Sequence, residues 1–314
     1  MIKQHSHPAF PEPLRKGDTI AILAPASIVK KEYVEEAARL FSAEGYDVRV
    51  LDSAVSEGTG SYSAPKDVRI AEFREAWEDP SVRCILCARG GYGAIHLLED
   101  LDETLSFDNP KWLVGFSDIS ALHALMNRHE IVSLHAPMVK HLATRGYDAA
   151  TRMLLRALRG EHNLEITGPA SSFNIPGEAT GRLVGGNLAV LNSLASTRFD
   201  MLSSPLADDC ILYLEDISEA IYAVERMLFR LRMAGVFNHT KGIIIGRFTE
   251  YRPDRNFKDM ETMIATRFKE WGIGNIPVAF DFPIGHIECN MPILNSAPAR
   301  LTVSKEKSTL IERL

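Results

Sequence analysis

The chain has 314 residues, of which 46% are hydrophobic and 24% are charged, and its formal net charge at pH 7 is −6. This composition is that of an ordinary globular protein and excludes extensive disorder. The acidic balance, without a cluster of Lys and Arg, argues against a nucleic-acid partner. The length exceeds what one hydrophobic core usually supports, so we expect two domains.

The sequence shows no sign of export or membrane insertion. No apolar run reaches the roughly 18 to 20 residues that a bilayer span needs, and the polar start lacks the apolar stretch of a signal peptide. We therefore expect a cytoplasmic protein without a membrane partner.

The four cysteines, Cys84, Cys87, Cys210 and Cys289, are too few and too scattered for a disulfide framework. Cys84 and Cys87 form a C-x-x-C within the segment VRCILCA, which is typical of a buried strand. Residues three apart on a strand point to opposite faces, so a core role is favoured over a redox or metal role. No metal-ligand pattern stands out elsewhere, and we expect neither a metal nor a cofactor.

The first half alternates strand-like and helix-like segments. Three apolar runs and the amphipathic stretches between them begin the series, and the first helix is expected to end at Gly45. The segments in chain order are TIAILAPAS, KKEYVEEAARLFSAEG, YDVRVLD, KDVRIAEFREAWED, VRCILCA, the turn RGGYG, AIHLLEDL, KWLVGF, DISALHALMNRHE and IVSLHAP. Such alternation predicts a mostly parallel sheet with helices on both faces.

The pattern breaks into polar and turn-forming residues between Gly160 and Gly181. We therefore expect a first α/β domain over residues 1–165, a linker over 166–180 and a smaller second domain over 181–314. The second half mixes strands and helices without a repeat. Its expected elements include the strand ILYLE, a helix from Ser218 to Gly235, and the strands GIIIGRF, ARLTVS and TLIERL.

Ser117 is the sharpest candidate for chemistry. It stands where the strand KWLVGF meets the helix that begins at Asp118. A serine at such a turn projects from the carboxyl edge of the sheet, and the helix amino terminus offers N–H groups to an oxyanion. For an isolated Ser-Asp pair, a helix N-cap is the commoner explanation. The glycine-rich turn from Arg89 to Gly93, which follows the preceding strand, favours the catalytic alternative because its backbone can approach a ligand closely.

A serine nucleophile needs a base. His123 and His129 lie on the helix after Ser117, and His135 ends the next strand. We favour His286, which stands on a loop with Pro and Gly after the segment IPVAFDF, and regard His135 as its nearest rival.

The base needs an acceptor that orients it. Glu215 ends the strand ILYLE, whereas Asp216 and Ser218 can cap the following helix, so Glu215 is the candidate. The turn of Gly185, Gly186 and Asn187 is either a ligand contact or a tight connection.

These segments together resemble the murein L,D-carboxypeptidase family of serine peptidases, which also includes the microcin C immunity peptidases. The likeness spans nearly the whole chain, through LRKGDTIAILAPAS, RGGYG, LVGFSDIS, HAPM, GRLVGGNL, LEDISEAIYAVERML and PIGH in family order. The resemblance implies the catalytic triad Ser117, Glu215 and His286, and an oxyanion hole formed by the backbone N–H groups of Gly91 and Asp118. Tyr92 and Asn187 are the candidate substrate contacts.

The resemblance also implies a fold and a substrate. The fold is an amino-terminal domain with a parallel sheet, similar to flavodoxin or glutamine amidotransferase, and a mixed α/β carboxyl-terminal domain, often in a homodimer. The expected reaction is hydrolysis of the bond between the diamino acid and D-alanine in murein tetrapeptides during cell-wall recycling. One alternative is a microcin C immunity-type peptidase that cleaves peptidyl acyl-sulfamoyl adenylates, and another is a muropeptide-binding protein without catalysis.

Overall fold

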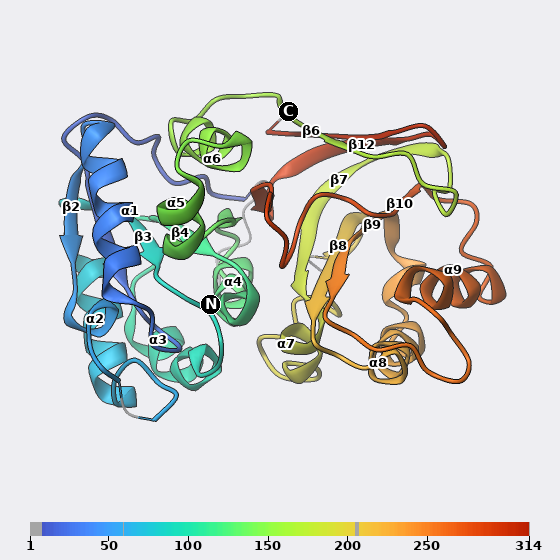
Figure 1. The fold of residues 1–314 in the computed structure, drawn as a ribbon, viewed down its shortest axis with the longest axis horizontal. Helices are drawn as coiled ribbons and strands as arrows, with labels where there is room; N and C mark the ends of the chain where they lie inside the picture. The colour runs from blue at the N-terminus through green and yellow to red at the C-terminus, as the bar shows by residue number, and fades with distance from the viewer. Residues whose placement is uncertain (1–7, 59, 205–206, 314) are drawn as a thin grey trace. The chain divides into compact units, whose positions relative to one another are not determined.

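The computed structural model describes residues 8–58, 60–204 and 207–313. The chain divides into two compact units, Met1–Glu161 and His162–Leu314, and each contains a sheet and its own buried core. Figure 1 shows the course of the chain through both units.

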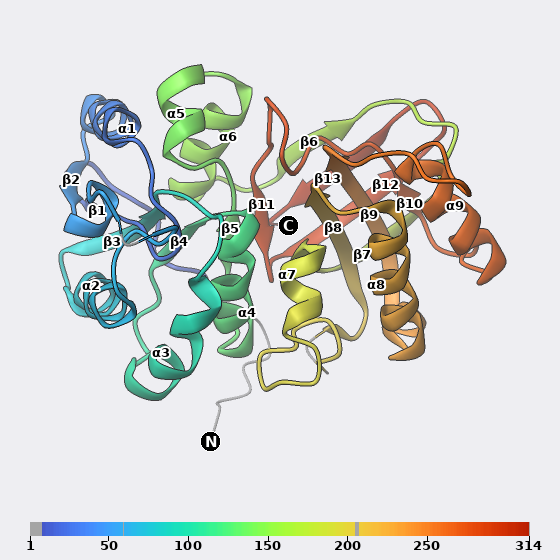
Figure 2. The same ribbon diagram turned by 60° about the horizontal axis from the view of Figure 1, so that its bottom comes forward.

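The first unit contains a parallel sheet in the order β5-β4-β3-β1-β2. Its strands are β1 (Thr19–Leu23), β2 (Asp47–Val50), β3 (Val82–Cys87), β4 (Trp112–Gly115) and β5 (Ser133–His135). Its helices are α1 (Lys31–Ala43), α2 (Lys66–Glu78), α3 (Leu98–Thr104), α4 (Ser120–Arg128), α5 (Val139–Arg145) and α6 (Ala149–Leu158). Helices α1, α5 and α6 lie on one face of the sheet, and α2, α3 and α4 lie on the other (Figure 2). The predicted parallel α/β domain is confirmed.

Helix α1 illustrates how the sequence specifies this unit. Val34, Ala37, Leu40 and Phe41 recur at helical spacing and are buried, while the charged residues between them remain outside. The helix ends before Gly45, whose φ of +90° lies in the left-handed region that glycine adopts without strain. The expected end of this helix is therefore observed.

The second unit contains a mixed sheet in the order β10-β9-β8-β7-β12-β13-β6. Its strands are β6 (Leu164–Gly168), β7 (Gly177–Asn187), β8 (Cys210–Ile217), β9 (Thr240–Thr249), β10 (Val278–Ala279), β12 (Pro298–Val303) and β13 (Ser308–Glu312), and β11 (Ile293–Asn295) follows β10 in the chain. Strands β7 to β10 pair in parallel, whereas β12 and β13 pair antiparallel with their neighbours. Helices α7 (Leu188–Ser193), α8 (Ile221–Met233) and α9 (Met260–Glu270) lie together on one side of this sheet (Figure 1).

The segment 166–180, expected to be a linker, contains the end of β6 and the start of β7. These strands pair with β13 and β12, respectively. Their partners lie more than a hundred residues later in the chain, so the local run of glycine and polar residues reads as a loop although both of its ends form strands.

The structure also describes four short 3₁₀ helices: η1 (Asp52–Ala54), η2 (Ala94–Leu97), η3 (Ser117–Ile119) and η5 (Val236–Asn238). In the part of the chain that the structure describes, no helix combines the length and the apolar character that a membrane span requires.

Candidate active site

Ser117 lies in a strained turn at the carboxyl end of β4. The strand ends at Gly115, and η3 begins at Ser117 itself, followed by α4. The φ of Ser117 is +65°, in the left-handed region that costs a residue with a side chain about 1–3 kcal/mol. Such strain persists only where the surroundings impose it, and it is a feature of nucleophile elbows. The backbone at Ser117 therefore has the geometry that presents a nucleophile at a sheet edge.

The glycine-rich turn after β3 lies directly against Ser117, as the order of the strands predicts. A Cβ atom added at Gly90 would be 2.9 Å from the Cβ of Ser117 and 3.1 Å from the backbone nitrogen of Asp118. Gly91 has a φ of +97°, and a Cβ there would lie 2.3 Å from the Oγ of Ser27. Only glycine allows this approach at either position. The backbone of the turn is thereby brought beside the candidate nucleophile.

The carboxylate of Asp118 connects these two turns. Its Oδ2 accepts a hydrogen bond of 2.8 Å from the backbone N–H of Ala94, at the start of η2. Burial raises the pKa of Asp118, although the N–H groups of Ala94 and Gly93 and the charges of His96 and Arg69 act in the opposite direction. Neither η3 nor α4 has a side-chain cap at its amino terminus. The alternative in which Ser117 or Asp118 serves only as a helix N-cap is therefore not what this turn shows.

The three candidate histidines of the first unit, His123, His129 and His135, have structural contacts. His123 is fully buried between the Oγ of Ser133 and the carbonyl of Gly115, each 2.8 Å away, and burial lowers its pKa to about 4. His129 stacks on Phe107 and lies 2.7 Å from Asp102. His135, the rival for the role of base, is fully buried, with its ring against Phe116 and His123.

Glu215 and His286 are in direct contact within the second unit. The Nδ1 of His286 lies 2.8 Å from the Oε2 of Glu215, close enough for the ring N–H to donate to the carboxylate. Glu215 is fully buried near the carboxyl end of β8, whereas the side chain of His286 remains 15% exposed. In serine peptidases a buried carboxylate orients the base through one ring nitrogen, and the other ring nitrogen takes the proton of the nucleophile.

Surrounding carboxylates control the charge of this histidine. Burial alone would lower the pKa of His286, but the hydrogen bond to Glu215 and the negative charges of Glu215, Asp216 and Glu250 outweigh it and raise the pKa above its ordinary value. The imidazolium that forms when a base accepts a proton is therefore stabilised here.

Two glycines fit closely around Glu215. A Cβ added at Gly285 would lie 2.8 Å from the Oε2 of Glu215, and one at Gly246 would lie 3.2 Å from its Cβ. Gly285 also has a φ of +109°, which a residue with a side chain rarely adopts. The loop that carries His286 can therefore approach Glu215 because both neighbouring positions lack a side chain.

Asp216 and Asn187 support the same edge of the sheet. Asp216 was expected to cap the helix after β8, but α8 begins only at Ile221 without a side-chain cap. Instead Asp216 accepts hydrogen bonds from the Nδ2 of Asn187 and from the backbone of Ala189, at 2.9 and 2.8 Å. Burial, followed by the charge of Glu215, raises the pKa of Asp216 to about 7. Asp216 therefore does not take the capping role that the sequence allowed, because its partner Asn187 comes from β7, far away in the sequence.

Asn187 itself lies opposite Glu215 in the pairing of β7 with β8. Its Oδ1 caps α7 by accepting the N–H of Val190 at 3.1 Å, and the residue is 3% exposed. Both ends of its amide therefore have partners within the protein. The tight strand-to-helix connection, one of the two expectations for this turn, is what the structure shows.

Tyr92 is the exposed side chain of the glycine-rich turn. It is 55% exposed, and its ring contacts those of Tyr62 and His96, with centroids 6.1 and 5.2 Å away. These contacts form an aromatic surface next to Gly91.

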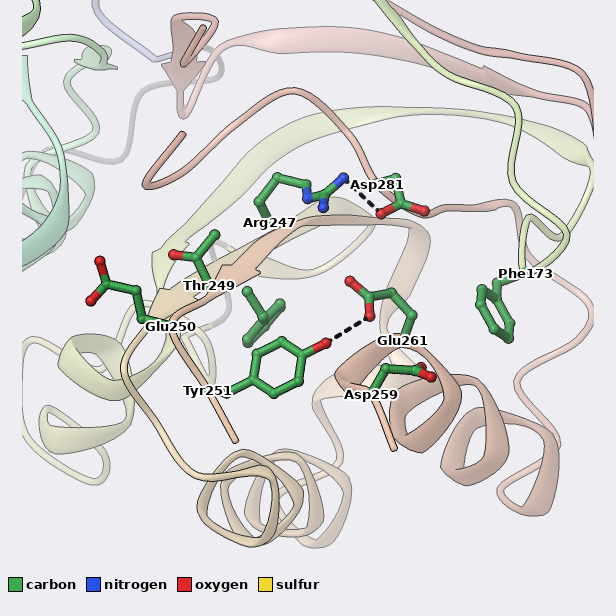
Figure 3. A pocket seen from close by; sticks show the side chains of 9 residues that line it. Phe173, Arg247, Thr249, Glu250, Tyr251, Asp259, Glu261 and Asp281 are labelled. Atoms are coloured by element: carbon green, nitrogen blue, oxygen red, sulfur yellow. Dashed lines mark hydrogen bonds and ion pairs between the residues drawn. The ribbon is translucent and has the colours of Figure 1, made fainter. Parts of the chain in front are cut away.

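A pocket of about 500 Å³ lies in the second unit, at the end of β9 and beside α9 (Figure 3). Two polar contacts join its lining residues: Arg247 forms an ion pair with Asp281 at 3.0 Å, and the hydroxyl of Tyr251 donates to Glu261 at 3.3 Å. Glu250, on its rim, is the lining residue whose charge acts on His286. We assign no ligand to this pocket.

Sequence patterns did not reveal the roles of the Asp118 carboxylate, Asp216 and Glu250 around these groups. A carboxylate near a helix start is usually a cap, and nothing in the local sequence distinguishes one that binds a distant turn. Within the described residues, no group of three or more His, Cys, Asp or Glu could hold a metal ion.

Comparisons with known proteins cover both units. Residues 20–136 match the LD-carboxypeptidase N-terminal domain, and residues 180–301 match the LD-carboxypeptidase C-terminal domain. A Streptomyces coelicolor protein with a provisional carboxypeptidase name is 32% identical over 309 residues, which cover 96% of this chain and 95% of the relative. The murein tetrapeptide carboxypeptidase of Pseudomonas aeruginosa is 28% identical over 279 residues, covering 85% of this chain and 87% of the relative.

Solved structures have the same fold. The muramoyltetrapeptide carboxypeptidase of Oxalobacter formigenes superposes with a TM-score of 0.80 at 27% identity and covers 94% of this chain and 98% of its own. An MccF-like protein of Bacillus anthracis gives a TM-score of 0.80 at 26% identity, with 98% of this chain and all of its own covered.

Proposed function

Because this chain belongs to the LD-carboxypeptidase family, we propose that it is a serine peptidase that hydrolyses the bond between the diamino acid and D-alanine in murein tetrapeptides. The family membership makes it a peptidase of the carboxypeptidase type. The substrate is supported by the names of relatives from Pseudomonas aeruginosa and Oxalobacter formigenes, both of which are tetrapeptide carboxypeptidases.

The observation that carries the proposal is the contact of 2.8 Å between His286 and the buried Glu215. A histidine held by a buried carboxylate is the base of serine peptidases, and it needs a nucleophile. Ser117, in its strained turn, is the candidate nucleophile. The proposal requires that Ser117 and His286 act in one catalytic centre.

In the proposed mechanism, His286 takes the proton of the Ser117 hydroxyl as its oxygen attacks the carbonyl carbon of the scissile bond. Glu215 stabilises the resulting imidazolium, and the backbone N–H groups of Gly91 and Asp118 bind the oxyanion. The imidazolium then protonates the departing amine of D-alanine and leaves an acyl-enzyme. Water, deprotonated by His286, hydrolyses this ester and restores Ser117. Each proton that His286 accepts is passed on in the next step, so the named residues complete the reaction without a cofactor.

The substrate contacts follow from exposure. Tyr92 is beside Gly91 and open to solvent, so it is the better of the two candidates. Asn187 is buried and bonded within the protein, so we propose that it supports the position of Asp216 beside Glu215. A cytoplasmic location, expected from the sequence, and a homodimer, implied by the resemblance, stay predictions.

A second function, cleavage of peptidyl acyl-sulfamoyl adenylates, is implied by the resemblance to the microcin C immunity peptidases, and the structural match to the MccF-like protein of Bacillus anthracis supports keeping it. It would use the same residues, so the two functions differ only in the substrate accepted.

The test is to incubate wild type and Ser117→Ala with L-Ala-γ-D-Glu-meso-diaminopimelate-D-Ala and to measure D-alanine by mass spectrometry. We expect release by wild type and a loss of turnover on the order of 10⁶-fold in Ser117→Ala. Ser193→Ala, which removes an exposed serine hydroxyl on α7, is the control and should retain turnover. Equal release by wild type and Ser117→Ala would show that Ser117 is not the nucleophile. Cleavage of an acyl-sulfamoyl adenylate, without cleavage of the tetrapeptide, would show that the second function is the correct one.

A further inference from the structure

Helix α2 carries a buried arginine on the face that packs on the sheet. Arg69 is only 2% exposed, although it lies among the charged residues of a helix that would ordinarily face solvent. A buried guanidinium is costly unless its donors are satisfied. Its partners should therefore explain why an arginine stands there.

The donors of Arg69 bind three separate segments. Its Nε donates to the carbonyl of Ala64 at 3.0 Å, and its Nη1 donates to the carbonyls of Pro25 and Gly93 at 2.7 and 2.9 Å. The guanidinium also lies over the ring of Tyr62, 5.1 Å from its centroid. Pro25 follows β1, Ala64 precedes α2 and Gly93 closes the glycine-rich turn, so one side chain fixes three loops at the carboxyl edge of the sheet.

One peptide group is held at both ends. Arg69 binds the carbonyl of Gly93, while the carboxylate of Asp118 binds the N–H of Ala94, which belongs to the same peptide unit. Gly93 has a φ of +123°, and a Cβ there would be 2.9 Å from the Nη1 of Arg69. The contact between arginine and turn is therefore as close as glycine allows.

A second anchor holds the other side of the turn. The backbone N–H of Ser27 donates to the carbonyl of Gly90 at 3.2 Å, and the Oγ of Ser27 accepts the N–H of Tyr92 at 3.2 Å. Arg69 supports this anchor too, because Pro25 belongs to the same loop as Ser27. Gly91 lies between these fixed points.

We propose that Arg69 is a positioning residue that holds the glycine-rich turn, and with it the backbone N–H of Gly91, against the turn that carries Ser117. This inference rests on the proposed function, in which Gly91 donates to the oxyanion. Oxyanion donors act because they are fixed before the reaction begins, and a misplacement of about 1 Å can cost on the order of 100-fold in rate.

The experiment compares Arg69→Met and Arg69→Lys with wild type. Methionine fills similar space without a donor, so we expect kcat to fall by about 100 to 1000-fold, as for loss of one oxyanion donor, with KM changed by less than about threefold. Lysine retains the charge but lacks the planar fork, so it should rescue part of the loss. Labelling of Ser117 by a fluorophosphonate should slow in parallel, and this readout does not depend on the peptide substrate.

Lys111→Met is the matched control. Lys111 is also buried, and its ammonium donates to the backbone carbonyls of Ala76 and Asp79, but it immediately precedes β4 at the end of the strand opposite Ser117. This variant should lose thermal stability as Arg69→Met does, yet keep its kcat. Amide hydrogen exchange should accelerate at residues 89–94 in Arg69→Met and not in Lys111→Met.

Two outcomes would overturn the inference: unchanged exchange at residues 89–94 in Arg69→Met, or equal losses of kcat in Arg69→Met and Lys111→Met. A wild type that neither releases D-alanine nor reacts with the fluorophosphonate would refute the proposed function instead. Hydrogen exchange would still decide whether Arg69 holds the turn.

Discussion

The charge of His286 depends on three carboxylates, Glu215, Asp216 and Glu250, and the contribution of each can be separated. As the proposed base, His286 is active only when its ring is neutral, so we expect the rate to fall as the pH drops through its raised pKa. This acidic limb is therefore a direct measure of how the site controls the base.

Glu215→Gln should lower both the rate and this pKa. The amide removes the hydrogen-bonded charge that raises the pKa of His286, so the acidic limb of the pH profile of kcat/KM should move to lower pH. The fall in kcat should be about 10⁴-fold, because the orientation of the ring is lost. Glu250→Gln is the control, because it also removes one charge near His286 but no hydrogen bond to the ring. The acidic limb should therefore shift less, and the maximal kcat/KM at higher pH should be retained. A limb that moves to higher pH in Glu215→Gln would contradict the assignment.

Single residues differed in how far the sequence could reveal them. Glu215 and His286 were predicted as partners from a strand end and a loop, and they lie 2.8 Å apart. Arg69 gave no signal, because a single arginine on a helix that carries several other charged residues reads as a solvated charge. Its burial follows from loops that come together only in three dimensions, which no local spacing records.

At the scale of elements, the pairing of β3 with β4 brings two turns into contact. Both turns were expected at the same edge, because consecutive strands of a parallel sheet end together, and the structure confirms their proximity. The start of α8 and the strands within 166–180 were not predictable in this way, since their partners are distant in the chain.

Gly90→Ala should therefore damage catalysis more than folding. The new Cβ would meet the Cβ and Oγ of Ser117 at 2.9 and 3.1 Å, so one of the two turns must shift. We expect kcat to fall on the order of 100-fold, as for a displacement of about 1 Å. Gly274→Ala, where an added Cβ meets nothing within 4 Å, should leave kcat unchanged. Steady-state kinetics with thermal melting of both variants will check this, and normal turnover in Gly90→Ala would show that the turns do not need their close contact.

At the scale of the whole molecule, each unit has a sheet and a core that exclude water from most cysteines. Cys84, Cys87 and Cys210 are buried and Cys289 is exposed, all as free thiols. Burial raises the pKa of Cys84 and Cys87 far above the ordinary thiol value and that of Cys210 to about 12. Thiolates, the reactive form, are therefore suppressed at these three positions.

An aromatic disulfide reagent should consequently label one thiol in the native protein and four in denaturant. Cys289→Ser should abolish the native reaction and leave three thiols after unfolding. Rapid labelling of a second thiol in the native state would mean that one of the cores opens, and fewer than three in the unfolded variant would indicate a disulfide.

The hydrogen bonds of the Arg69 guanidinium also affect the order in which the first unit folds. Those to Pro25 and Gly93 join residues 44 and 24 positions apart, and they can form only after β1, β3 and α2 have assembled. Contacts of this kind close after the local ones, since the entropy of the intervening loops must first be lost. A chain with its sheet complete but these hydrogen bonds not yet formed would be compact, and yet its glycine-rich turn would not be fixed. We therefore expect the sheet of this unit to become compact before the glycine-rich turn reaches its final position.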